Sequence, residues 1–283
     1  ANDGLYFNWG AKSVTTLASA NTAAIAARMT SVGTLTFDIA DGAASPDLLV
    51  SGYVIGGGGV TKNGLGTMTL IGDSSYTGGT TVNAGTFQVG NGGSVGSIAA
   101  ASAVAVAAGA VMKWDNNNDT ANYGIGNALS GAGLVVLQGY NSAASLQNAV
   151  YEMSGNNSGL TGVLAVNRSM LWNNTNQTVM GAAVIDIQDR GTVAFNNGGA
   201  YNNYIVIGPN AGWRHNAGGD VVLGAIRMEG NNTLSGNIVL SNMTSVAGGE
   251  NPGANSTIGG WSAGNHTLSG VISGSGDFSM SRY

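Results

Sequence analysis

The chain of 283 residues contains 48 glycines, only 3 prolines and no cysteine, and 8% of its residues are charged. A hydrophobic share of 43% and a net charge of -5 exclude an intrinsically disordered polypeptide. Glycine without a three-residue period excludes a collagen-like helix, and no apolar run reaches the roughly 18 residues of a membrane helix. The 9 Lys and Arg residues form no cluster. We therefore expect no nucleic-acid partner and no membrane insertion of this segment.

The apolar residues recur mainly with a period of two, which is the period of a half-buried strand. Residues 18–29 are the one segment whose alanines favour a helix, although Asn21 and Thr22 interrupt it. Elsewhere the alternation predicts strands at 34–39, 67–71, 81–82, 86–89, 104–106, 183–187 and 192–195. We expect an all-β fold with six inward-facing residues around its turns: Val82, Val89, Val104, Val106, Ile185 and Ile187.

A strand-turn-strand unit recurs at residues 81–89, 105–113 and 187–195, with a poorer copy at 165–172. Its turn residue is normally glycine. Gly66, Gly85, Gly109 and Gly133 are 19 to 24 residues apart, which is the spacing of one solenoid coil. No proline-rich or charged linker interrupts the chain, so we expect a single continuous β-solenoid domain over residues 1–283.

Residues 55–90 contain the ordered motifs GxGxxTK, GxGTxTLxG and YTGGTTVNAGT and end in VG. This stretch closely resembles the autotransporter-associated β-strand repeat found in passenger regions of large bacterial surface proteins. Residues 94–114 resemble the spacer coil that follows such a repeat, and residues 267–283 resemble the start of another. The resemblance implies a right-handed parallel β-helix that is exported and lies outside the cell or at its surface.

The sequence predicts no catalytic residue, no cofactor and no metal site. His215 and His266 are isolated, and cysteine is absent. Three acidic pairs remain, and we interpret them as solvent-facing or turn residues: Asp38 with Asp41, Asp115 with Asp119, and Asp186 with Asp189. We therefore expect that the protein is not an enzyme.

Four residues near Asn- or Gly-rich turns are candidate glycan contacts: Trp213, Arg214, His215 and Trp261. Aromatic rings at such turns can reach the surface and stack on sugars. The alternative is that they cap strand ends or cover the core, and the same two interpretations apply to Trp114 and Trp172.

We expect an extracellular structural or adhesive β-solenoid, displayed at the bacterial surface or assembled into a fibre or surface layer. Its expected partners are further copies of itself, stacked head to tail, and surface glycans or matrix. Self-association is expected because no charged or proline-rich cap follows residues 270–280. Two alternatives remain open on the same scaffold: a carbohydrate-active enzyme, either polysaccharide lyase or glycosidase, and a glycan-binding module without catalysis.

Overall fold

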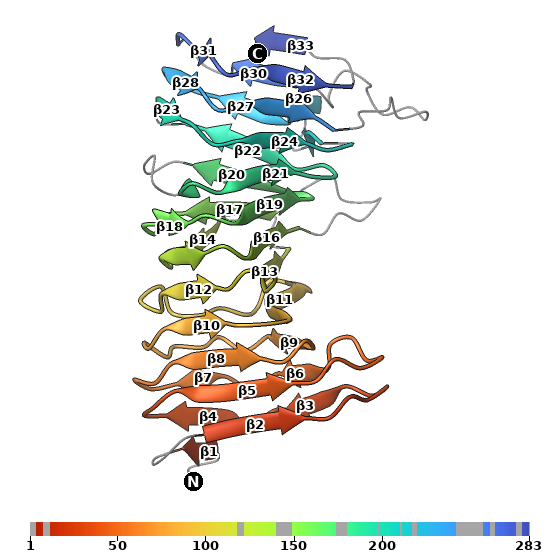
Figure 1. Cartoon of the computed structure of the whole chain (residues 1–283), viewed down its shortest axis with the longest axis vertical. Helices are drawn as coiled ribbons and strands as arrows, with labels where there is room; N and C mark the ends of the chain where they lie inside the picture. Colours follow the sequence, from red (N-terminus) through yellow and green to blue (C-terminus); the bar gives the residue numbers. More distant parts are fainter. Residues whose placement is uncertain are drawn as a thin grey trace. The chain divides into compact units, whose positions relative to one another are not determined.

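The computed structural model describes residues 4–7, 12–117, 122–139, 149–173, 180–196, 198–209, 211–216, 220–241, 257–260, 264–275 and 279–282 (Figure 1). These residues form strands and turns and contain no α-helix, so none of them lies in a helix that could cross a membrane. The chain divides into unit 1, residues 1–116 and 126–136, and unit 2, residues 117–125 and 137–283. The single continuous domain over residues 1–283 stays a prediction.

Unit 1 is a parallel β-helix whose strands pair in the orders β1-β4-β7, β15-β12-β10-β8-β5-β2 and β3-β6-β9-β11-β13-β16. In Figure 1 the chain runs from β2 in front to β3 and β4 behind and rises to β5, which is a right-handed winding. Its strands are β1 (Gly4–Phe7), β2 (Lys12–Thr16), β3 (Ala23–Ile25), β4 (Arg28–Ser31), β5 (Leu35–Ile39), β6 (Leu48–Val50), β7 (Val54–Ile55), β8 (Val60–Asn63), β9 (Thr67–Leu70), β10 (Thr80–Val82), β11 (Thr86–Gly93), β12 (Val104–Val106), β13 (Val111–Asn116), β15 (Leu129–Gly131) and β16 (Leu134–Gln138), whose last two residues belong to unit 2.

Unit 2 has the same parallel architecture, with pairing orders β19-β21-β24-β29-β32, β14-β17-β20-β22-β27-β30-β33 and β23-β28-β31. An antiparallel hairpin, β25-β26, is added to it. Its strands are β14 (Tyr123–Ile125), β17 (Ala149–Met153), β18 (Gly159–Leu160), β19 (Val163–Asn167), β20 (Ser169–Asn173), β21 (Val184–Ile187), β22 (Thr192–Phe195), β23 (Gly199–Tyr201), β24 (Ile205–Ile207), β25 (Trp213–Asn216), β26 (Asp220–Gly224), β27 (Ile226–Met228), β28 (Asn232–Leu234), β29 (Ile238–Leu240), β30 (Thr257–Gly260), β31 (Thr267–Leu268), β32 (Ile272–Gly274) and β33 (Ser279–Arg282).

Part of the segment 18–29, whose alanines favour a helix, forms strands instead. Ala23–Ile25 is β3 and pairs with β6, and Arg28 begins β4, which pairs with β1 and β7. Alanine prefers a helix in an isolated peptide, but here β3 pairs with β6, and β4 pairs with β1 and β7, so neighbouring strands supply hydrogen-bond partners. Tertiary pairing therefore overrides the local preference.

The strand register gives the length of each coil in unit 1. Val60 pairs with Thr80, and Thr80 pairs with Val104, so these successive coils contain 20 and 24 residues. The predicted solenoid spacing is therefore confirmed. Because the strands are parallel and pair in register, each inward side chain lies directly above its counterpart in the previous coil, about 4.8 Å away along the stack.

The six residues predicted to face inward are all buried, with at most 1% of each side chain exposed. In unit 1 they belong to continuous columns, for example the column in which Val50, Leu70, Val89 and Trp114 pair in turn. Trp114 itself is 1% exposed, so it fills the core and is not a surface contact. The prediction of an all-β right-handed parallel β-helix is confirmed.

Lys62, from the sequence motif GxGxxTK, is a charged residue in one of these apolar columns. It pairs with Phe37 on one side and Val82 on the other, and it is completely buried. Its Nζ atom donates hydrogen bonds to the carbonyl oxygens of Asn63 at 2.9 Å, of Gly64 at 2.9 Å and of Ala84 in the next coil at 3.2 Å. The lysine thus joins the turns of two successive coils from inside.

Tyr76 and Thr80, from the sequence motif YTGGTTVNAGT, form a second buried link between coils. The Tyr76 hydroxyl lies 2.7 Å from Thr80 Oγ1, which lies 3.0 Å from the Ser102 hydroxyl of the next coil. Asn127 of the following coil donates through Nδ2 to the Ser102 carbonyl at 2.7 Å. Burial raises the pKa of Tyr76 to about 12, so the hydroxyl stays protonated and available for this network.

We predict that replacing Lys62 with Met changes the pH dependence of stability. Desolvation lowers the pKa of Lys62 from 10.5 to about 8, against the opposing attraction of Asp38 and Asp47. Between these two values the unfolded chain binds more protons than the folded one, so the stability of the native protein rises with pH. Each pH unit above 8 adds at most about 1.4 kcal/mol, so the free energy of unfolding relative to Lys62→Met should rise by about 2 kcal/mol between pH 8 and 9.5.

Urea denaturation at both pH values measures this difference. The higher pH of the comparison is kept below 10. Near pH 10 the tyrosines of the unfolded chain begin to ionise, and Tyr76 would then add its own pH dependence to the measured stability. The same substitution at the partly exposed Lys12 controls for the loss of a lysine. The free energy of unfolding of the native protein relative to Lys62→Met should rise with pH. If this difference is constant or falls, the unfolded chain does not bind more protons than the folded one, and the assignment is wrong.

Candidate functional site

A depression of ≈ 610 Å³ lies on unit 2, at the ends of β21 and β24. We call it the β21–β24 depression, and it is lined by Asp186, Gln188, Asp189, Val206, Gly208, Pro209 and Ser241. Asp186 pairs with Val206, and both point away from the core because their neighbours Ile185, Ile187, Ile205 and Ile207 are buried. The outward direction predicted for Asp186 is therefore correct.

The polar groups of the depression are partly held by hydrogen bonds. Gln188 Nε2 donates to Asp186 Oδ2 at 2.8 Å. On the turn that follows, Asp189 Oδ2 lies 2.9 Å from Arg168 Nε and forms an ion pair with it, while the two side chains stay 33% and 44% exposed. Asp189 thus lies at a turn, as predicted, and its charge is compensated by an arginine of the previous coil.

Two arginines at these turns have a backbone conformation that favours glycine. Arg168 has a φ of 49° and Arg190 a φ of 55°. In unit 1 the equivalent role in the recurrent motif belongs to glycine, since Gly85 and Gly109 have φ values of 61° and 81°. The recurrent motif predicts glycine rather than arginine at these turns, except in the poorer copy at residues 165–172. Side chains in this region of φ cost free energy, so the turns are held by the coils on either side.

Tyr204 lies two residues before Val206, which lines the depression, and the sequence motifs did not indicate it. It precedes β24, and 43% of its side chain is exposed, whereas its neighbour Ile205 is 2% exposed. Tyr204 therefore points outward on the same face as Val206, two residues further along the strand. The signal was present in the alternation of Tyr204, Ile205, Val206 and Ile207, but that segment had not been assigned as a strand.

Three of the four candidate glycan contacts lie on the added hairpin. Trp213, Arg214 and His215 belong to β25, and β25 pairs antiparallel with β26 with an irregularity between Trp213 and Arg214. The side chains of these three residues and all of Trp261 lie outside the described residues. Their role as glycan contacts stays a prediction.

Trp172, the other tryptophan weighed as a surface contact, lies on the outer face of β20. Its ring lies 5.4 Å from the guanidinium carbon of Arg227, in cation–π geometry, and Arg227 also forms an ion pair with Glu229. Trp172 packs against Met170 and Ala194, which are completely buried. These contacts agree with the interpretation that Trp172 covers buried residues of the coil, rather than with a glycan contact.

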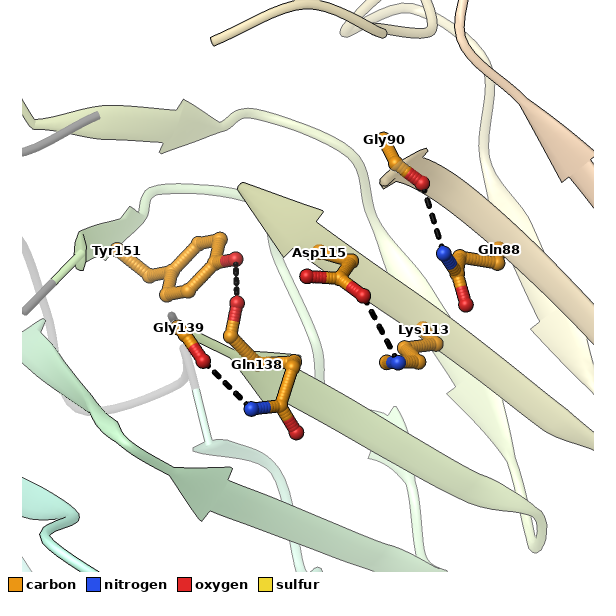
Figure 2. Close-up of polar contacts among 7 residues, drawn as sticks. All are labelled: Gln88, Gly90, Lys113, Asp115, Gln138, Gly139 and Tyr151. Atoms are coloured by element: carbon orange, nitrogen blue, oxygen red, sulfur yellow. Dashed lines mark hydrogen bonds and ion pairs between the residues drawn. The ribbon is translucent and has the colours of Figure 1, made fainter. Parts of the chain in front are cut away.

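Unit 1 contains polar contacts of the same local kind at strand ends, shown in Figure 2. Gln88 Nε2 donates to the Gly90 carbonyl at 2.9 Å, and Lys113, which pairs with Gln88 in the sheet, lies 2.9 Å from Asp115 Oδ2. Asp115 is therefore part of an ion pair, and its predicted companion Asp119 lies outside the described residues.

In unit 2, Figure 2 shows the Tyr151 hydroxyl donating to the Gln138 carbonyl at 2.5 Å, while Gln138 Nε2 donates to the Gly139 carbonyl at 2.6 Å. Across the described parts of both units, no three acidic or histidine side chains come together as metal ligands would. His266 is partly buried, and desolvation lowers the pKa of its imidazole below 6.5.

Comparisons with known proteins place this chain in a functional context. Residues 60–89 match the model of the passenger-associated-transport-repeat, within the predicted repeat at 55–90. The chain is also 33% identical over 125 residues, 42% of its length, to a protein named Adhesin BmaC autotransporter from Brucella suis biovar 1 (strain 1330). The match spans 4% of that relative. No solved structure gives a significant match.

The chain thus contains one passenger-associated-transport-repeat, at residues 60–89, within a parallel β-helix. The resemblance derived from residues 55–90 is confirmed, and so is an exported, extracellular or cell-surface location. Over 125 residues, the chain is also similar in sequence to an autotransporter adhesin. That residues 267–283 begin another repeat stays a prediction.

We predict that glycine at position 168 is more stable than alanine at the same position. Both variants lose the ion pair with Asp189, but only alanine must place a Cβ atom at a φ of 49°. Arg168→Gly should therefore exceed Arg168→Ala by about 1 kcal/mol in the free energy of unfolding, measured by urea denaturation. Equal stability of the two variants would mean that this turn relaxes to a negative φ.

Proposed function

We propose that this chain is a non-catalytic adhesive segment of a surface-displayed passenger. One observation carries the proposal, namely the 33% identity over 125 residues to a protein named as an adhesin. The architecture supports it, because stacked coils bury the inward face of each strand, while outward residues such as Thr81, Gln88 and Val206 stay partly exposed.

The arrangement of acidic residues also favours binding over catalysis. Of the described carboxylates that had been weighed as catalytic pairs, Asp115 is paired with Lys113 and Asp189 with Arg168. A glycosidase needs two free carboxyl groups on either side of a sugar, and a lyase needs a basic residue beside the abstracted proton. Asp186 and Asp189 both line an open depression, where Asp189 already has a cationic partner.

Latex beads coated with the purified chain test the adhesive function. They should adhere to epithelial cell monolayers and to immobilised matrix proteins several times more than beads coated with serum albumin. Beads coated with the heat-denatured chain serve as a second control, because adhesion by a folded surface should be lost on unfolding. Equal numbers of bound beads on all surfaces would refute the adhesive function.

We predict no turnover of pectin, alginate or other uronic polysaccharides by the purified chain. The ultraviolet absorbance of an unsaturated product reports lyase activity, and a reducing-sugar assay reports hydrolysis. Asp189→Asn and Arg190→Ala should behave like the native protein in both assays. Activity that disappears in either variant would favour the carbohydrate-active enzyme instead.

Assembly into a fibre or surface layer by head-to-tail stacking stays a prediction from the sequence. Electron microscopy of the purified chain at high concentration tests it. Monomers throughout would count against stacking, whereas fibres would support it.

A further inference from the structure

We propose that the β21–β24 depression of unit 2 binds a neutral saccharide, with Tyr204 as a stacking platform and Asp186 and Gln188 as partners for sugar hydroxyls. This assignment names a ligand class for the adhesive function proposed above and rests on it. The site is distinct from the hairpin residues that the sequence suggested as glycan contacts.

The exposed ring of Tyr204 supplies the apolar part of such a site. Its side chain is 43% exposed beside Val206, which lies two residues, about 6.6 Å, further along the strand. One face of a pyranose ring carries mainly C–H groups and stacks on an aromatic ring, while the phenol hydroxyl stays in water. An outward tyrosine next to a depression thus offers a surface that fits one sugar ring.

Asp186 and Gln188 supply the polar part. A carboxylate has about four lone-pair positions, of which the Gln188 amide uses one on Asp186 Oδ2. Both side chains line the depression, so the remaining carboxylate lone pairs and the amide oxygen can accept hydrogen bonds from vicinal hydroxyl groups. The hydrogen bond between the two side chains fixes their orientation before a ligand arrives, which lowers the entropic cost of binding.

Gly208 forms part of the lining, and its φ does not lie in the left-handed region that favours glycine. An added Cβ would meet its nearest atom, the Ile187 carbonyl oxygen, at 3.1 Å. At Gly52 and Gly72 the equivalent distance to a backbone oxygen is 2.0 Å, which no side chain could tolerate. The absence of a side chain at position 208 therefore avoids a tight contact with this carbonyl group and also keeps the depression open.

The charge of the depression selects neutral ligands. Asp189 is compensated by Arg168, but Asp186 is bonded to an uncharged amide, so the lining is net negative. Uronic or sialic acids would bring a second carboxylate close to Asp186 and be repelled. The volume of ≈ 610 Å³ is within the range of roughly 300–1,000 Å³ found for small-molecule sites.

A glycan array probed with the purified chain tests the assignment. We expect binding to neutral hexose oligosaccharides and none to their uronic or sialylated counterparts. Isothermal titration with the strongest neutral ligand should then show a loss of affinity of at least tenfold in both Tyr204→Ala and Asp186→Asn. Tyr53→Ala removes a tyrosine of similar exposure, 40%, from unit 1 and should bind as the native chain does. Urea denaturation verifies that all variants fold.

The assignment is overturned if no neutral oligosaccharide binds, or if binding persists in both Tyr204→Ala and Asp186→Asn. It is also overturned if acidic glycans bind better than neutral ones. The bead assay separates these failures from failure of the adhesive function. If the beads adhere but no glycan on the array binds, the adhesive function stands and the saccharide site is refuted. If glycans bind on the array but the beads do not adhere, the saccharide site stands and the adhesive function is refuted.

Discussion

The rest of the structure depends on the parallel hydrogen bonding that joins each strand to the same strand of the next coil. Because the register is fixed, every inward position is repeated at about 4.8 Å, and a side chain can be buried only if it tolerates its counterparts above and below. Apolar columns such as Val50, Leu70 and Val89 satisfy this condition without further partners. Polar groups satisfy it only when neighbouring coils supply their bonds, as the carbonyl groups around Lys62 do.

The same constraint explains the residues of the matched repeat. In residues 60–89 the lysine, the tyrosine and the threonine that had defined a motif in the sequence are all buried and bonded to another turn or coil. Their identity is therefore dictated by the interior of the coil rather than by a ligand. The positions that are free to serve binding are the outward ones, which alternate with these along the same strands.

How far the sequence predicts the structure follows from this division. Period-two alternation and glycine spacing predict the fold and the inward residues, because both are consequences of the local backbone and the burial of one face. The candidate site could be predicted only in part, since the sequence indicated an outward Asp186 but residues 204–207 had not been assigned as a strand. Asp186 and Val206 lie side by side only through the pairing of β21 with β24, so the sequence could not indicate that Tyr204, two residues before Val206, lies in the segment next to β21. Arg168 and Arg190 adopt positive φ because adjacent coils hold them, so no local propensity could indicate it.

The coils of unit 2 also differ greatly in length. Ile185 pairs with Ile205 and Ile205 with Ile238, so one step along the stack takes 20 residues and the next takes 33, part of which forms the β25–β26 hairpin. The ladder on either side keeps its register in spite of this difference. Evolution can therefore lengthen or exchange the corner segments while the scaffold stays unchanged, which gives such a surface protein a route to vary its epitopes. The same corners are natural acceptor positions for grafting foreign peptides in display applications.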